Sequence, residues 1–252
     1  MTTAKIDLAI GVGGVTAFST LRGRLTAGDP YSGFNACHYV GDTPAHVDAC
    51  RGLLCRDLGI DSDHLVMARQ THTDRVALIE RLPVAADALE ETDGLVTRLR
   101  GVALAVNTAD CVPLLMADAE AGVIAAVHSG WRGTVARIAA KAVEAMQEIG
   151  AGPSRIRAAL GPMICSGCFE VGDEVAERFR ADFPAEVVTR GREGRPHVDL
   201  GAAVRHTLIA SGLEAENIAP APVCSRCNPD RFFSARRLGV ASGRTLSVIM
   251  LR

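Results

Sequence analysis

Aromatic residues are scarce in this chain, and neither sign of charge is in clear excess. Phe, Tyr and Trp make up 4% of the 252 residues, with a single tryptophan and two tyrosines. Aspartate and glutamate number 29 against 27 lysines and arginines, which leaves a formal net charge of −2. Proteins that bind nucleic acid usually carry a basic surface and often stack bases on aromatic rings. The composition therefore predicts no nucleic-acid partner.

A long uncharged run is also missing. The longest such stretch near the N-terminus, residues 8–21, is broken by glycines and is shorter than the roughly 20 residues that span a bilayer. Asp7 directly precedes it, which disfavours a secretory signal. We therefore expect a cytoplasmic protein that has no membrane partner. In that compartment its eight cysteines are predicted to be thiols or metal ligands rather than disulfides.

The sequence shows no internal repeat and no convincing linker, so we expect a single domain over residues 1–252. Short apolar runs predict strands at residues 65–69, 75–80, 102–107, 113–117, 123–128 and 246–251. Helices are predicted at residues 44–58, 133–149, 172–183 and 200–211. The strands at 102–128 are nearly continuous in apolar character, as is typical of strands buried on both faces. Strand clusters with helices between them predict an α/β or α+β sandwich.

Three polar residues stand at the ends of these apolar runs. His72 lies in a turn between two predicted strands, Cys111 lies at the junction of two others, and His128 ends a third. Strand ends at one sheet edge are a common place for side chains to converge. One thiolate and two imidazoles form a three-ligand set that suits catalytic zinc, with a fourth position open, and copper accepts the same ligands. The pattern therefore favours a metal site.

The same atoms permit other interpretations. Taken singly, a cysteine in an apolar run is usually a small core residue, and a histidine at a strand end is usually a hydrogen-bonded structural group. Cys111 and His128 can also form a thiolate–imidazole nucleophile pair, oriented by Asp110 or His72, as in cysteine hydrolases. Spacing alone leaves these alternatives open, because 39 residues separate His72 from Cys111 and 17 separate Cys111 from His128.

The segment after His128 reads SGWRGT and precedes a predicted long helix. A glycine-bearing turn at a helix start offers free backbone N–H groups to an anion, and a guanidinium adds a charged fork. We therefore expect a phosphate-sized site formed by Ser129, Gly130, Arg132 and Gly133. Trp131 is equally consistent with core packing and with a stacking wall for a flat ligand.

Two C-x-x-C pairs, Cys165 with Cys168 and Cys224 with Cys227, remain. Together they can make a Cys₄ zinc site if the fold brings them into contact. However, 55 residues lie between the pairs, far more than the usual spacing of zinc knuckles. The spacing therefore disfavours a shared site.

Five segments carry a resemblance to a known family: QTHTDRV, TADCVPLLMAD, AAVHSGWRGT, GPMICSGCFEVGDEV and CNPDRFFSARR with a following SGR. The chain resembles the laccase-domain family, also called multicopper polyphenol oxidoreductase or peptidoglycan editing factor, from about Asn35 to its C-terminus. The resemblance implies an α/β sandwich with mixed sheets, a fold shared with a cysteine-hydrolase-like superfamily. It also implies that His72, Cys111 and His128 bind a metal, with zinc preferred.

The activity that the resemblance implies is phosphorolysis of purine nucleosides. Adenosine, inosine, guanosine and methylthioadenosine would be split by phosphate to the base and a sugar 1-phosphate, and adenosine deamination can accompany this reaction. Two alternatives attached to the family are copper-dependent oxidation of polyphenols and a Cys–His hydrolase or amidase role in editing peptidoglycan precursors. Linked copper centres need many histidines near one site, and this chain has seven in all.

The roles expected from this resemblance and from the residues can be assigned as a hypothesis. Cys111, His128 and Arg132 are the predicted catalytic residues, and Arg132 with the backbone of residues 129–133 is expected to hold phosphate. Zinc on the triad would polarise the substrate or supply hydroxide for deamination. Asn35, Gln70 and Arg22 are candidate polar contacts in the pocket. The family usually has a tyrosine at Ala235, and its HAGWRG motif reads HSGWRG here.

Overall fold

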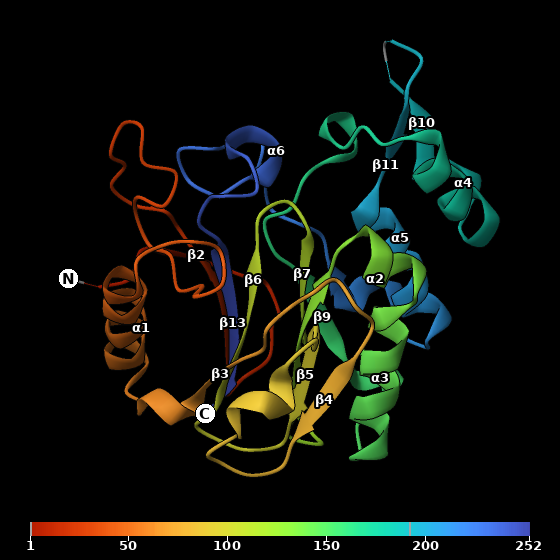
Figure 1. Ribbon diagram of the computed structural model, residues 1–252. Helices are drawn as coiled ribbons and strands as arrows, with labels where there is room; N and C mark the ends of the chain where they lie inside the picture. Colours follow the sequence, from red (N-terminus) through yellow and green to blue (C-terminus); the bar gives the residue numbers. More distant parts are fainter. Residues whose placement is uncertain (1, 192) are drawn as a thin grey trace.

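A computed structural model describes residues 2–191 and 193–252 of the chain. It shows a mixed α/β fold in which two sheets lie face to face, with helices on both outer sides (Figure 1). Parallel and antiparallel pairs occur in both sheets, so both are mixed. This architecture agrees with the predicted α/β sandwich of mixed sheets. Within the described residues, no helix is long and apolar enough to cross a membrane.

The first sheet has five strands within the described residues. In spatial order they are β1 (Lys5–Asp7), β2 (Val15–Thr20), β13 (Thr245–Leu251), β6 (Ala103–Thr108) and β3 (Leu65–Met67). The second sheet has six strands in the same part of the chain. These are β12 (Ile218–Ala219), β9 (Arg157–Leu160), β7 (Val112–Asp118), β8 (Val123–Ser129), β5 (Gly94–Thr97) and β4 (Val76–Ile79). A separate hairpin pairs β10 (Val188–Arg190) with β11 (Pro196–Val198).

Alternation along β7 shows how one strand serves two cores. Leu114 and Met116 pack in the cluster shared with the helices, whereas Leu115 and Ala117 pack in the cluster between the two sheets. All seven residues of β7 are buried. The strand is therefore apolar throughout rather than alternating, which confirms the expectation of strands buried on both faces. The four-residue strands β5 and β9 were not predicted, because a run so short with both faces buried has no detectable period.

Helices cover the outer face of each sheet, whereas the short α6 lies above the strand ends, as Figure 1 shows. Their bounds are α1 (Pro44–Leu58), α2 (Trp131–Val135), α3 (Ile138–Glu148), α4 (Asp173–Asp182), α5 (Leu200–Ala210) and α6 (Ala235–Leu238). Helix α1 packs on the first sheet through Cys50, Leu54 and Leu58. Helices α3, α4 and α5 pack on the second sheet.

One predicted helix is wrong in its continuity. Residues 133–149 were expected to form a single helix, but the structure ends α2 at Val135 and begins α3 at Ile138. The break lies at Arg137, which has a positive φ of 61° although it is not glycine. Its guanidinium lies 4.1 Å from the centre of the Phe183 ring and donates to Thr207 Oγ1 at 3.2 Å. Tertiary contacts thus accompany a turn that helix propensity alone does not indicate.

Candidate functional site

The three predicted ligand residues come from three separate segments of the chain and lie close together. His72 lies between β3 and β4, Cys111 lies between β6 and β7, and His128 is in β8. Their donor atoms all lie within 4.8 Å of one another, and Cys111 Sγ is 3.8 Å from His72 Nε2. Each connection from β3 to β4 and from β6 to β7 crosses from one sheet to the other. These crossings therefore bring together side chains that are far apart in the sequence.

A buried carboxylate, Asp93, holds two of these ligands in place. It directly precedes β5 and accepts a hydrogen bond from His128 Nδ1 at 2.6 Å. The same carboxylate accepts the backbone N–H groups of Thr71, His72 and Thr73 at 2.9 to 3.1 Å. These bonds fix the turn in which His72 adopts a positive φ of 65°. Sequence analysis missed Asp93, because nothing but a single acid before an apolar strand marks it.

The ionisable groups Asp93, Cys111 and His128 strongly affect one another's charge. Burial raises the pKa of Asp93, but the hydrogen bond and charge of His128 outweigh it and lower the pKa to about 2. Burial likewise disfavours the thiolate of Cys111, yet the two histidines lower its pKa to about 6. Burial lowers the pKa of His128, whereas Cys111 and Asp93 raise it to a net value of about 9. A thiolate–imidazolium pair at neutral pH follows from these values.

The donor set fits a metal ion. Because Asp93 holds Nδ1 of His128, Nε2 is the nitrogen left to act as a ligand, and a carboxylate behind a ligating histidine is the usual support. Gly130 leaves the space that the ligands occupy. A Cβ at this position would lie 2.8 Å from His72 Cδ2 and 3.2 Å from Cys111 Sγ. Close packing thus favours glycine at position 130, in addition to the anion-binding role that the sequence indicated.

A cavity of about 240 Å³ adjoins the three ligands. It is lined by Tyr39, Val40, Gln70, His72, Asn107, Ala109, Cys111, His128, Ala235, Val240 and Arg244. Both amide atoms of Gln70 bond to the backbone of Asn107, each at 2.7 Å. The side-chain oxygen and nitrogen of Asn107 are buried next to the Tyr39 side chain, and neither makes a well-formed hydrogen bond within the described residues. Such an unpaired amide in a cavity wall is available to a ligand.

The predicted residues Asn35 and Arg22 do not line this cavity. Asn35 donates to Asp42 Oδ2 at 2.7 Å and accepts the backbone N–H of Arg244 at 3.0 Å. It therefore positions the loop that carries Arg244. The Arg22 guanidinium donates to the Pro229 carbonyl at 2.7 Å. Asn107 and Arg244 were missed as site residues, although they lie next to or within the motifs TADC and SGR.

The SGWRGT turn does not contribute to the wall of this cavity. The helix that it starts, α2, has five residues, and the exposed Arg132 lies 4.4 Å from the Trp131 ring rather than in the cavity wall. Ser129 Oγ is paired with Thr134 Oγ1 at 2.8 Å. Trp131 packs against the core formed with the helices, which favours its packing interpretation. The arginine that lines the cavity is Arg244 instead.

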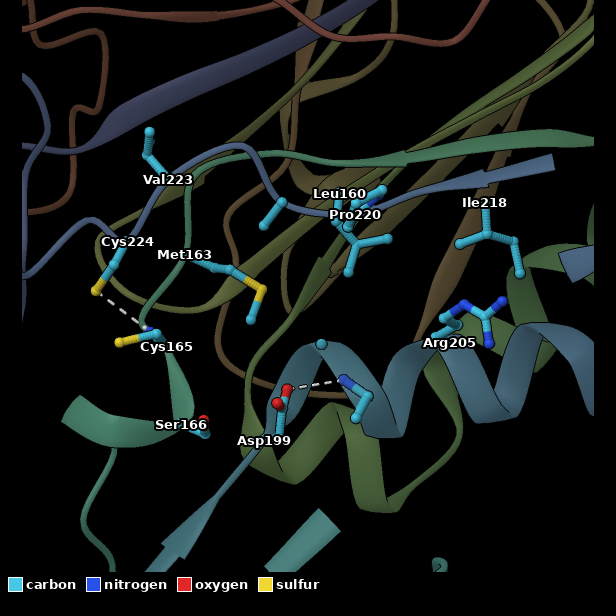
Figure 2. Close-up of a pocket in the computed structure, with 13 residues that line it drawn as sticks. Leu160, Met163, Cys165, Ser166, Asp199, Arg205, Ile218, Pro220, Val223 and Cys224 are labelled. Atoms are coloured by element: carbon cyan, nitrogen blue, oxygen red, sulfur yellow. Dashed lines mark hydrogen bonds between the residues drawn. The ribbon is translucent and has the colours of Figure 1, made fainter. Parts of the chain in front are cut away.

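A larger cavity of about 360 Å³ lies elsewhere, between α5 and the loop that follows β12 (Figure 2). Its wall is mainly apolar, and its few polar side chains include Asp199, which caps α5 by accepting the Ala202 N–H at 2.9 Å. None of the three predicted ligands lines it. We therefore take the smaller cavity as the candidate site, because the three predicted ligands line it.

Beside this larger cavity the two C-x-x-C pairs meet. The Sγ atoms of Cys165, Cys168, Cys224 and Cys227 all lie within 4.8 Å of one another. The spacing argument against a shared site is therefore wrong, because β9 and β12 are paired in parallel and bring the two following loops together. Three clusters of the described residues have the donor atoms to hold a metal: the four cysteines, the His–Cys–His group, and Asp61 with Asp63 and His64.

Comparison with known proteins agrees with this geometry. The family model described as multi-copper polyphenol oxidoreductase laccase matches residues 16–252. A protein named adenosine deaminase RL5, from an unknown prokaryotic organism, is 51% identical over 97% of both chains. A purine nucleoside phosphorylase of Deinococcus radiodurans is 43% identical over 93% of this chain and 88% of its own.

A solved structure supports the same relationship. The crystal structure of the Bacillus licheniformis hypothetical protein YfiH superposes with a TM-score of 0.88 at 31% sequence identity. The match covers 94% of this chain and 93% of that one. Together, the sequence match over most of the chain and the shared fold show that this protein belongs to the multi-copper polyphenol oxidoreductase laccase family.

Proposed function

We propose that this protein is a zinc-dependent purine nucleoside phosphorylase that also deaminates adenosine. The observation that carries the proposal is a His–Cys–His ligand group opening on a cavity with an unpaired buried amide and an arginine. The names of the relatives, purine nucleoside phosphorylase and adenosine deaminase, support the same pair of reactions. Phosphorolysis needs a nucleoside and inorganic phosphate bound side by side, so one cavity must recognise both.

His72, Cys111 and His128 are the residues that would hold zinc. A mixed nitrogen and sulfur set suits zinc, and three protein ligands leave one position open. When bound, zinc supplies Lewis-acid activation beside the cavity. Asp93 contributes by accepting the Nδ1 proton of His128, which keeps the ring in one orientation with Nε2 toward the site.

Asn107 is the residue that we expect to recognise the purine. Its amide offers one donor and one acceptor side by side, which complements the paired donor and acceptor on a purine edge. Gln70 bonds to the Asn107 backbone on both sides and so holds this part of the wall rigid. Replacing Asn107 should raise KM for nucleoside, because the polar atoms of the purine that it contacts would then be buried without a hydrogen-bond partner.

Arg244 is the residue that we expect to bring positive charge to phosphate. It lines the cavity, and its Nη1 and Nη2 atoms already donate to carbonyls of residues 240, 242 and 243, so the guanidinium is held in one place. Arg132, the residue that the sequence indicated, lies outside the wall. Comparing Arg244→Gln with Arg132→Gln therefore separates the two assignments: KM for phosphate should rise in the first variant and change little in the second.

The activity is tested by incubating the purified, zinc-assayed protein with inosine or adenosine, with and without phosphate. Free base and sugar 1-phosphate are followed by chromatography, and inosine formed from adenosine reports deamination. Base release that requires phosphate and disappears in Cys111→Ala is the expected result. A folded, zinc-loaded sample that releases no base would refute the proposal.

A metal-free cysteine hydrolase or amidase is the second candidate. The observation that favours it is the Cys111–His128–Asp93 arrangement, in which a low-pKa thiol, an imidazole and an orienting carboxylate follow one another. This candidate predicts turnover of amide substrates that survives chelation and is abolished by iodoacetamide. Copper oxidation of polyphenols is less well supported, because only one group of potential ligands within the described residues contains two histidines.

A further inference from the structure

The four clustered cysteines have the geometry of a closed metal site rather than of disulfides. Zinc binds thiolates at about 2.3 Å, so a tetrahedral Cys₄ site places sulfurs about 3.8 Å apart, against about 2.05 Å in a disulfide. Cys168 Sγ and Cys227 Sγ are 3.5 Å apart, and all four atoms lie within 4.8 Å. The cysteines are half-buried except Cys227, which is exposed, so an ion has access from solvent.

Donors around the sulfurs suit thiolates. The backbone N–H of Cys165 donates to Cys224 Sγ at 3.3 Å, and the Arg226 guanidinium donates to Cys168 Sγ at 3.3 Å. Four thiolates and one divalent zinc sum to a charge of −2, which N–H groups and a nearby cation stabilise. Four protein ligands leave no open position, and this closure is typical of a structural rather than a catalytic zinc.

The loop between Cys224 and Cys227 is bonded to the turn that carries Cys111. Ser225 Oγ donates to Asp110 Oδ1 at 2.7 Å, and the backbone N–H of Arg236 donates to Asp110 Oδ2 at 2.7 Å. Asp110 directly precedes Cys111 and has a positive φ of 93°. The Asp110 carbonyl also accepts the N–H of Ile164, just before Cys165. Both cysteine pairs are therefore one or two residues from a hydrogen bond to Asp110.

We propose that Cys165, Cys168, Cys224 and Cys227 bind a second, structural zinc ion that holds the Asp110–Cys111 turn in position. The ion ties the loop after β9 to the loop after β12, and Asp110 bonds to both loops. This inference goes beyond the proposed activity, since it concerns a site that touches no substrate. It explains why two C-x-x-C pairs so far apart in the sequence meet next to the functional turn.

Zinc stoichiometry tests the site directly. Full-length protein, purified under reducing conditions, is dialysed against buffered zinc and assayed by plasma mass spectrometry. Two zinc ions per chain are expected for the wild type, one for Cys168→Ser/Cys227→Ser, and one for His72→Ala. The matched control, Cys55→Ala, removes a thiol from α1 outside either cluster and should still carry two. Cobalt substitution gives a second readout, because thiolate-to-cobalt charge-transfer absorption should fall sharply in the double variant.

The link to Asp110 is tested by hydrogen–deuterium exchange on the same proteins. Loss of the second zinc should speed amide exchange in residues 109–111 and 223–237, with α1 unchanged. If the double variant fails to fold, the same measurements are made on Cys227→Ser alone. This variant should bind the second zinc more weakly, since only three ligands remain. A wild type that carries one zinc, lost only in His72→Ala, overturns the proposal. So does intact-mass loss of two hydrogens per cysteine pair, which indicates disulfides.

Discussion

Asp93 accepts four N–H hydrogen bonds, from three backbone groups and from His128 Nδ1. Thr73 Oγ1 also lies 2.9 Å from the carboxylate and shares its one hydrogen between Asp93 and the Glu91 carbonyl. A carboxylate with that many donors is strongly favoured in its charged form. It therefore sets the orientation of His128 and, through His128, the ionisation of Cys111. One carboxylate outside the His–Cys–His group thus governs the orientation and charge of the residues within it.

The charge state of Cys111 gives a pH prediction for the chelated protein. Its pKa of about 6 means that the thiolate, the reactive form, predominates above pH 6 and falls tenfold per unit below it. Iodoacetamide labelling of Cys111 should therefore rise up to about pH 6 and then level off. An ordinary cysteine would keep rising to about pH 8.5. Peptide mass spectrometry measures the labelling of each cysteine separately.

Asp93→Asn is the matched variant for this experiment. Removing the carboxylate charge lowers the pKa of His128, which weakens the cation beside Cys111, so the labelling midpoint should shift upward. A wild-type midpoint near pH 8.5, unchanged in Asp93→Asn, would contradict the coupling described for these three residues.

At this scale the sequence predicted which three residues converge, but not the residues that support them. His72, Cys111 and His128 stand out in the sequence because they are polar residues at the ends of apolar runs. Asp93 and Asn107 do not stand out in that way. Their importance depends on a carboxylate reaching a turn some 20 residues earlier and on an amide left unpaired in a wall, and only the folded chain shows either.

Among the elements, β8 and α2 illustrate how close packing defines the site. Gly130 joins them with φ −74° and ψ 172°, values that any residue adopts, so its backbone does not require glycine. What requires glycine is space, since a Cβ would press on His72 and Cys111. The predicted anion-binding turn is thus a place where the absence of a side chain lets two ligands approach each other.

Gly130→Ala should consequently displace a ligand while leaving the fold intact. With the Cβ only 2.8 Å from His72 Cδ2, the ring must move, and we expect zinc affinity at this site to fall by about 10–100-fold, as for other changes that misplace a ligand. Competition with a chromogenic chelator measures the affinity. Gly13→Ala is the control, because nothing lies within 4 Å of a Cβ there. Equal affinities in the two variants would show that His72 is not constrained by position 130.

The helices were easier to predict than their interruptions. The boundaries of α1 agree with the predicted residues 44–58, because Pro44 marks its start and Gly59, with φ 68°, its end. No such residue marks the break between α2 and α3, where Arg137 takes a positive φ amid contacts with Phe183 and Thr207. Local signals thus predict an element where proline or glycine punctuates it, and fail where distant contacts decide.

At the scale of the whole molecule, the candidate site is built from the six-stranded sheet and from connections between the two sheets. His72 and Cys111 lie on chain crossings from the five-stranded to the six-stranded sheet, and His128 belongs to the six-stranded sheet. Sequence patterns predicted strands and the sandwich, but not which strands share a sheet, because the pairings of β13 with β2 and with β6 join segments far apart in the sequence. The same limit concealed the meeting of the two cysteine pairs.

A metal held by three separate segments must be released when the molecule unfolds, so zinc at this site should stabilise the whole fold. At a free zinc concentration 100 times Kd the stabilisation is about 2.7 kcal/mol. For a chain of this size that corresponds to a Tm increase of roughly 5–10 °C. Scanning calorimetry of Cys168→Ser/Cys227→Ser, in which only the His–Cys–His group remains, isolates the effect. Adding His72→Ala to that background should abolish the increase. An equal Tm rise in both proteins would place the stabilising zinc somewhere other than between the two sheets.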